Sequence, residues 1–146
     1  MTDARFEDGG DRPLHLVARD GDDLSVIAAL CQDAVLTAAD LRWDRRRRRF
    51  AALLNRFRWE DLPAARAAGR RVERVRSLLV VAEVTALRRQ GIVPGDSATV
   101  LSLLTLAFQP DQDGTGRLTL TFAGDGAIAA EVEALDITLK DVTRPY

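Results

Sequence analysis

Only one stretch of this chain has helical periodicity, and this limits the fold more than any other feature of the sequence. Apolar residues recur there at i, i+3, i+4 and i+7 after Asp20–Asp23, which offer an N-cap. The other apolar segments are short, follow a period of two or none, and are separated by Gly, Pro and Asp, as is typical of strands and turns. The helical stripe consists of Leu24, Ile27, Ala28, Cys31, Ala34 and Val35.

The remaining apolar segments predict seven strands with short connections, and such strands pair antiparallel. Because free sheet edges are costly in a small chain, the sheet is expected to curl or close. We therefore predict an α+β fold with a single strongly bent antiparallel sheet or partly open barrel of about seven strands, and one N-terminal helix. The expected strands are 14–18, 41–44, 50–59, 72–87, 100–108, 117–123 and 127–135.

The segment from Phe50 to Trp59 is apolar on both strand faces. Phe50, Ala52 and Leu54 share one face, and Ala51, Leu53, Phe57 and Trp59 share the other. A strand with two apolar faces lies in the middle of a sheet that is covered on both sides. This segment is therefore predicted to be central, with one layer above it and another below.

The length and composition indicate one domain. The chain has 146 residues, of which 47% are hydrophobic, and no apolar run approaches the length of a membrane span. Residues 1–12 are acidic and contain glycine, so we expect a flexible arm there and a single domain over 13–146. Cys31 is the only cysteine, and the arm does not resemble a secretory signal, which favours a cytoplasmic protein.

Charge is segregated along the chain although the net charge is only −1. Residues 42–89 contain 15 Arg against 5 acidic residues, including five consecutive arginines at Arg45–Arg49. Such a stretch is able to form a positive face for nucleic acid or a phosphate ligand. The alternative is that antiparallel neighbours interleave the two signs, with Arg45–Arg49 as a solvated hairpin connection.

The residue types needed for catalysis or metal binding do not come together in the sequence. The single histidine, His15, lies on an apolar strand, where a structural role is expected, and Cys31 lies on the apolar stripe of the helix. Gly95–Thr99 lacks the second glycine of a nucleophile elbow. Asp111–Gly116 lacks the spacing of a calcium loop. We therefore expect no catalytic residue, no metal site and no cofactor.

Polar residues within the apolar strands are the remaining candidates. Glu83 interrupts a strand face and is expected to be buried against an arginine of a neighbouring strand. Asn55 is expected to be a buried structural amide bonded to a loop backbone. Arg56, Arg58 and Trp59 are the best candidates for a ligand-binding site, provided that a bulge at the strand end turns them together.

The stretch Asn-Arg-Phe-Arg-Trp-Glu at residues 55–60 carries a family resemblance. Together with residues 24–35, 100–110 and 118–135, it resembles a family of small alphaproteobacterial proteins known only as a domain of unknown function. The resemblance covers residues 14–139. It implies a bacterial, cytoplasmic protein and brings no activity, ligand or catalytic residue.

These observations lead to three function classes. We expect a non-enzymatic binding or protein-interaction domain, with an unknown protein or a small anionic ligand as its partner and no membrane. The alternatives are nucleic-acid or phosphate-ligand binding through residues 42–89, and an enzyme of unknown class.

Overall fold

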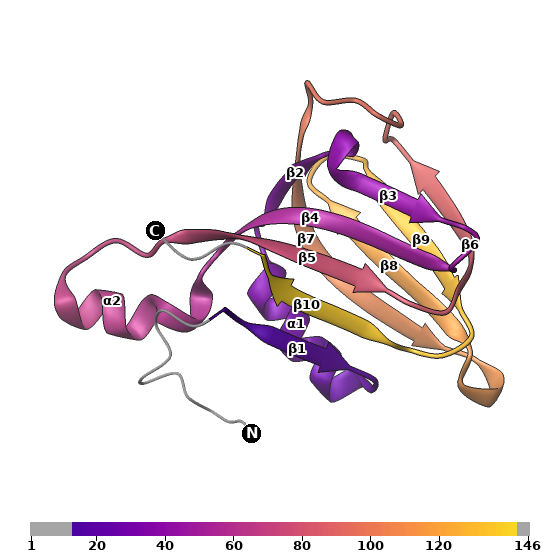
Figure 1. The fold of residues 1–146 in the computed structure, drawn as a ribbon, viewed down its shortest axis with the longest axis horizontal. Coiled ribbons are helices and arrows are strands. Elements are labelled where there is room, and N and C mark those ends of the chain that lie inside the picture. The colour runs from indigo at the N-terminus through magenta and orange to yellow at the C-terminus, as the bar shows by residue number, and fades with distance from the viewer. Residues whose placement is uncertain (1–12, 143–146) are drawn as a thin grey trace.

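One open antiparallel sheet dominates the structure, a computed structural model that describes residues 13–142 (Figure 1). The strands are β1 His15–Ala18, β2 Val35–Thr37, β3 Leu41–Asp44, β4 Arg49–Phe57, β5 Arg74–Val81, β6 Val84–Gln90, β7 Val100–Pro110, β8 Gly116–Phe122, β9 Ala127–Val132 and β10 Ile137–Asp141. The α-helices are α1 Gly21–Cys31 and α2 Leu62–Ala68, and the 3-10 turns are η1 Ala38–Asp40, η2 Trp59–Asp61 and η3 Gln112–Gly114.

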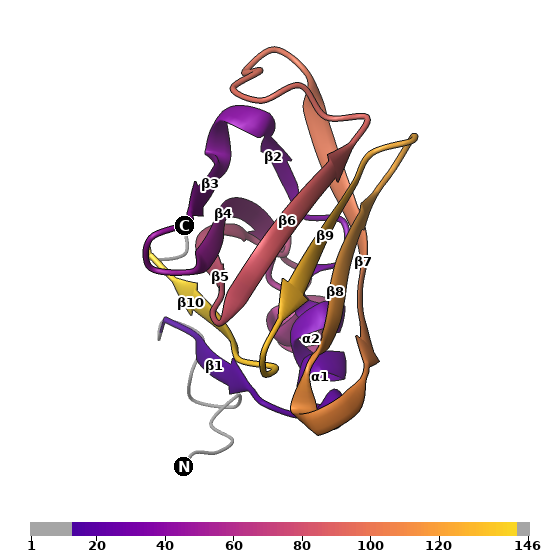
Figure 2. The same cartoon turned by 90° about the vertical axis from the view of Figure 1, so that its right-hand side faces the viewer.

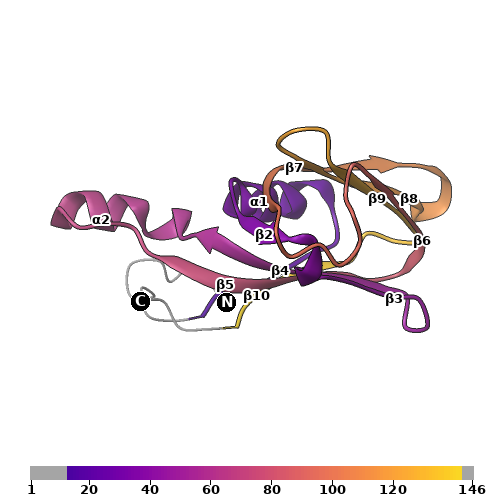
Figure 3. The same cartoon turned by 90° about the horizontal axis from the view of Figure 1, so that it is seen from above.

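The strand order is β1-β10-β5-β4-β2-β7-β8-β9-β6, and β3 pairs with β4. We call β1, β10, β5, β4 and β3 the first half of the sheet, and β7, β8, β9 and β6 the second half. The second half folds over the inner face of the first, with α1 on the same side (Figures 2 and 3). One core fills the space between them, including Phe50 and Leu79 from the first half, Leu120 and Ile128 from the second, and Ile27 from α1.

The helix α1 begins where the sequence predicts it but ends earlier. Asp20 caps it by accepting a hydrogen bond from the Asp23 backbone N–H at 2.8 Å. Beyond Cys31 the chain turns at Asp33, whose φ is 64°. The Asp33 N–H then donates to the Leu103 carbonyl, and the Leu103 N–H donates to the Ala34 carbonyl, both at 2.8 Å. Pairing with β7 therefore diverts Val35 from the predicted helix into β2.

The predicted fold class was wrong. The structure is mostly antiparallel sheet with ten strands and two short helices, and the sheet is open. The strands β2 and β10 were missed because each is only three to five residues long and is held by distant partners. Residues 62–68 form the short helix α2, which projects away from the sheet (Figure 1). Neither helix within 13–142 is long and apolar enough to cross a bilayer.

The predicted long strand 72–87 is divided by a corner at Ala82–Glu83. Glu83 has a φ of 59°, and the Val84 N–H donates to the Arg48 carbonyl at 2.9 Å, so β6 leaves the first half and joins β9. Glu83 does pair with an arginine, with 3.3 Å between its Oε1 and Arg48 Nη2. It lies half-exposed in the corner, however, and not buried on a strand face as expected.

The arginine run is a hairpin connection, one of the two predicted alternatives. Arg45–Arg48 form the turn between β3 and β4, Arg49 begins β4, and all five are exposed. Arg48 also forms an ion pair with Glu133. The predicted arm at 1–12 lies outside the described residues.

The β6–β7 connection approaches the β8–β9 hairpin at Gly91, which gives a testable prediction. Gly91 has a φ of 67°, and a Cβ there would lie 2.8 Å from the Asp125 carbonyl oxygen; Gly95 has a φ of 78° but open space around it. Gly95→Ala is expected to lower the unfolding free energy by about 1–2 kcal/mol through backbone strain alone. Gly91→Ala should cost roughly a further 1–3 kcal/mol, because the hairpin must shift. Equal losses for the two variants in urea denaturation would contradict this.

Candidate functional site

Arg56, the centre of the predicted site, is the largest fully buried side chain of the described residues. It follows Phe50, Ala52 and Leu54 on the inward face of β4, and its relative exposure is 0%. A guanidinium keeps its charge in a protein, so its burial is costly unless carboxylates and other acceptors surround it. The contacts of Arg56 therefore decide how this end of the sheet is built.

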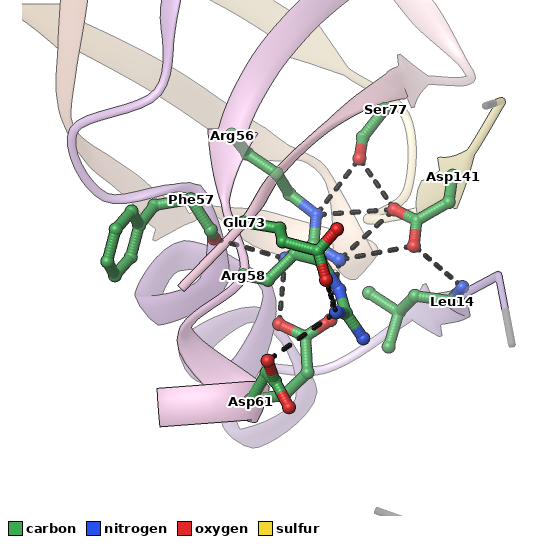
Figure 4. A network of polar contacts seen from close by, with 9 residues as sticks. Leu14, Arg56, Phe57, Arg58, Asp61, Glu73, Ser77 and Asp141 are labelled. Atoms are coloured by element: carbon green, nitrogen blue, oxygen red, sulfur yellow. Dashed lines mark hydrogen bonds and ion pairs between the residues drawn. The ribbon is translucent and has the colours of Figure 1, made fainter. Parts of the chain in front are cut away.

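Acceptors from three elements surround Arg56 (Figure 4). Glu60 of η2 accepts two parallel hydrogen bonds, from Nη1 at 2.9 Å and Nη2 at 2.8 Å. Asp141 of β10 accepts from Nη2 at 3.1 Å, and Ser77 of β5 accepts from Nε at 2.9 Å. The guanidinium is thus held by a local carboxylate and by one 85 residues away.

Asp141 extends the network to the start of β1. Its Oδ2 accepts from the Leu14 backbone N–H at 2.8 Å, and its Oδ1 accepts from the Ser77 hydroxyl at 2.6 Å. Arg56 and Asp141 therefore join β4, β5, β10 and the chain entering β1 at one point.

Arg58 belongs to a second ionic group beside the first. It is 3% exposed, and its Nη1 lies 3.6 Å from Asp61 and 3.7 Å from Glu73. Asp61 also accepts two hydrogen bonds from Arg70, at 2.7 and 3.1 Å. These contacts fix η2 and α2 against the start of β5.

The neighbouring arginines hold Glu60 and Asp61 in their ionised form. Burial opposes ionisation of Glu60, but the hydrogen bonds and charge of Arg56, with the charge of Arg58, outweigh it, so the pKa of Glu60 lies below its ordinary value. The pKa of Asp61 is also lowered, first by its hydrogen bonds from Arg70 and then by the charge of Arg58, against the effect of burial.

Trp59 points away from this network. It begins η2, its indole N–H donates to the Gln32 carbonyl at 3.0 Å, and its ring meets Phe57 edge-on with centroids 4.6 Å apart. Trp59 therefore fastens the end of β4 to the end of α1, and it remains half-buried.

The structure does not bring the three predicted residues together on one surface. Arg56 and Arg58 are buried in internal ion pairs, and Trp59 contacts the α1–β2 connection. Two cavities in the described part of the chain, of about 920 and 390 Å³, have other linings. The geometry gives these residues structural roles, and ligand binding by them stays a prediction.

The outer face of the first half is the surface that these contacts hold in place. Directly paired residues point to the same side, so the strand register defines this face (Figure 1). Its middle is a band of apolar and threonine side chains, none of them buried. The band consists of Ala51 and Leu53 of β4, Leu78 and Val80 of β5, Thr138 of β10 and Val17 of β1.

Cationic residues lie at both ends of this apolar band. Arg49 lies at the hairpin end, and Arg42 of β3 lies beside the band, paired with Ala51. At the other end Arg74 and Arg76 of β5 lie near Lys140 of β10. All five are exposed.

The sequence correctly predicted that both faces of β4 carry apolar residues. The prediction of a covering layer on each of these faces was wrong. Only the inner face is covered by other described elements, and the outer apolar residues remain half-buried. Asn55 also lies on this outer face, where its Oδ1 accepts from Arg74 Nη1 at 3.4 Å. Asn55 is only half-buried, and its side chain bonds Arg74 of β5 and, within residues 13–142, no loop backbone, so the expectation of a buried amide bonded to a loop was wrong.

The cysteine and histidine have the following environments. Cys31 is buried, as predicted, and desolvation raises its pKa to about 12 despite the opposing charge of Arg56. His15 is exposed on β1, at the edge of the outer face. Over residues 13–142, no three His, Cys, Asp or Glu side chains are placed to hold a metal ion.

The lowered pKa of Glu60 predicts a pH dependence of stability. Its ionised form stabilises the fold, so this contribution is complete above the ordinary Glu pKa of 4.5 and is lost as the pH falls through the lower folded value. The difference in unfolding free energy between wild type and Glu60→Gln should therefore shrink from about pH 7 to about pH 3. Asp125→Asn, at an exposed hairpin, is the control. A difference that stays constant with pH would contradict the assignment.

Removing the guanidinium leaves Asp141 buried without its main countercharge. Arg56→Met is expected to lower the unfolding free energy by about 3–5 kcal/mol, measured by urea denaturation. Adding Asp141→Asn should recover part of this loss, because no charge then remains without compensation at that position. Arg71→Ala, at an exposed position, should change stability by less than about 0.5 kcal/mol. If Arg56→Met lowers the unfolding free energy no more than Arg71→Ala does, the network does not hold the fold.

Comparisons with known proteins give a family and no activity. Neither the curated proteins nor the solved structures yield a match. The family model of DUF2948, described as a protein of unknown function, matches residues 14–146. The resemblance of the sequence to a domain of unknown function is thereby confirmed, and the chain belongs to the DUF2948 family.

Proposed function

We propose that this protein is a non-enzymatic protein-interaction domain whose outer face on the first half of the sheet docks an acidic partner protein. The observation that carries the proposal is the apolar band on β4 and β5, over which no described element packs. The side chains of this band on β4 and β5 are only half-buried, whereas a central pair of strands with two apolar faces is normally covered on both. Val17 at its edge is 44% exposed.

The arrangement of the face favours a protein over a nucleic acid. Protein interfaces have an apolar centre surrounded by a polar rim, and here the cations lie on both sides of the apolar band. Proteins that bind single-stranded nucleic acid commonly offer several aromatic side chains on which successive bases stack. Among the described paired strands, Phe57 is the one Phe, Tyr or Trp on this face, and the Arg74 guanidinium lies over its ring at 5.9 Å. The face therefore lacks a row of aromatic rings on which successive bases would stack.

The size of the face favours a protein over a small anionic ligand. The concavity beside Asn55 and Arg76 holds only about 50 Å³. Ligand pockets usually have roughly 300–1,000 Å³. A broad partner surface fits this face better than a small molecule does.

The charges indicate the character of the partner. Arg42, Arg49 and Lys140 are exposed around the apolar band. Asp44 is the carboxylate on the paired strands of this face, and it lies 3.5 Å from Arg47. Acidic residues around an apolar patch would complement this pattern. We place the interaction in the cytoplasm, which agrees with a free, buried Cys31.

Affinity capture with surface variants tests the proposal. Tagged wild type is compared with Val17→Asp and Lys140→Glu in lysate of cells that express the chain natively. The matched controls are Val93→Asp and Arg88→Glu, which change exposed residues outside the first half of the sheet. We expect an acidic protein that both outer-face variants lose and both controls retain.

Two results would overturn the proposal. One is a captured protein whose retention is the same for all four variants. The other is capture that disappears after nuclease treatment and is lost in Lys140→Glu but not in Val17→Asp, which would indicate nucleic-acid binding instead.

A further inference from the structure

The strand β7 has a free edge over much of its length. It runs from Val100 to Pro110, and β8 pairs with it from Leu103 onward. On its other side β2 pairs only with Val100–Ser102, followed by the two backbone bonds of Leu103 with Asp33 and Ala34. From Leu104 to Pro110 no described strand lies on that side, and α1 runs nearby.

The ladder shows which backbone groups of β7 face this edge. In an antiparallel ladder, residue pairs that hydrogen-bond to each other alternate with pairs that do not. The Asp111 N–H donates to the Thr115 carbonyl at 2.7 Å, so this alternation can be counted back from Asp111 along the pairing of β7 with β8. Gln109 and Ala107 are thereby bonded to β8. The N–H and C=O groups of Leu106 and Phe108 point away from β8, toward the free edge.

The β8–β9 hairpin leads to the same assignment. The Phe122 N–H donates to the Gly126 carbonyl at 2.9 Å, so the alternation pairs Leu120 with Ile128 by hydrogen bonds. The backbone groups of Leu120 therefore face β9, which leaves those of Leu106, opposite Leu120, without a partner in β8.

A cavity of about 920 Å³ runs beside this edge. Its lining includes Leu24 and Ala28 of α1, Leu106 and Phe108 of β7, and Leu135. The edge from Leu106 to Pro110 is about 14 Å long at strand spacing, which matches four to five residues of extended chain. The cavity thus combines a strand edge with apolar pockets for alternate side chains.

Carboxylates surround one end of this groove. Asp20, Asp22 and Asp23 lie at the start of α1, and Asp111 and Asp113 lie in and beside η3, next to Pro110 and Gly114 of the lining. Arg19 is the cation among the lining residues, and all of these charged side chains are exposed. The charge at this end favours a cationic occupant.

We propose that this groove binds an extended peptide that adds to β7 as an antiparallel strand. Its backbone bonds the Leu106 and Phe108 groups, alternate apolar side chains enter the groove, and basic residues at its N-terminal end lie near the carboxylates. An antiparallel peptide enters from the Pro110 end, because the α1–β2 connection blocks the other end at Asp33 and Ala34. The site is separate from the outer face and opposite to it in charge.

The premise is tested first by amide hydrogen exchange of the full chain. The amides of Leu106 and Phe108 are expected to exchange faster than those of Thr105 and Ala107, which bond to β8. Slow exchange at Leu106 and Phe108, equal to that of their neighbours, would overturn the assignment of a free edge.

Binding is tested with a fluorescein-labelled octapeptide of two lysines, alternating valine and threonine, and a final glycine. We expect saturable anisotropy, at least tenfold greater protection of the Leu106 and Phe108 amides, and at least tenfold weaker binding when both lysines are replaced by glutamate. Two further peptides carry N-methyl groups on alternate amides: one on the odd-numbered residues and the other on the even-numbered residues. One of the two should bind and the other should fail, because only one set of amides faces β7.

Site variants locate the peptide. Ser25→Trp places a large ring at an exposed position that lines the groove, and should weaken binding at least tenfold. Val26→Trp, at the neighbouring exposed position outside the lining, should leave binding unchanged. The proposal is overturned if the octapeptide shows no saturable binding, if both N-methylated peptides bind like the unmodified peptide, or if Ser25→Trp binds as tightly as Val26→Trp.

Discussion

The buried charge of Arg56 is the interaction on which this fold depends most. The guanidinium has no water to solvate it, so Glu60, Ser77 and Asp141 must all be in place before the inner face of the sheet closes. Those acceptors come from η2, β5 and β10, and Asp141 in turn fixes the chain entering β1. Apolar residues in the same space would pack without such demands. The network therefore specifies how η2, β5, β10 and the chain entering β1 are arranged around β4.

The open sheet explains why the protein presents two different surfaces. Its first half uses one face for the core and leaves the other as an apolar band between cations. Its second half leaves part of the β7 edge, beside α1, without a neighbouring strand among the described residues. Free edges promote aggregation, and Pro110, which has no N–H to offer, lies at the exposed end of this one. The helix α1 lies beside this edge.

The sequence allowed prediction of the local features. Asp20 as a cap, the β3–β4 hairpin at Arg45–Arg48 and the consecutive strands expected at 117–123 and 127–135 all depend on residues close in sequence. The features that were missed depend on distant pairing: Val35 joins β7 instead of α1, and β10 forms between β1 and β5. Glu83 was placed within a strand because glutamate, unlike Asn, Asp or His, is not enriched in the left-handed backbone conformation that it adopts here.

The burial of Arg56 did have a signal in the sequence. Phe50, Ala52 and Leu54 set a period of two that puts Arg56 on the inward face, and Glu60 follows four residues later as a local partner. The sequence instead predicted a ligand-binding site at Arg56, Arg58 and Trp59, because the apolar pattern of the strand fades where two cations and an indole appear. The second partner, Asp141, has no signal near Arg56 and required the structure.

The distance between Arg56 and Asp141 along the chain affects how the protein is made. A ribosome adds roughly 5–20 residues per second, so the 85 residues between them take about 4–17 s to synthesise. During that interval Glu60 is the only one of the two carboxylate partners that has been made, and β1 has no β10 with which to pair. The first half of the sheet therefore cannot be completed during synthesis until the residues of β10 have emerged, although α1 and the β3–β4 hairpin have all their residues much earlier.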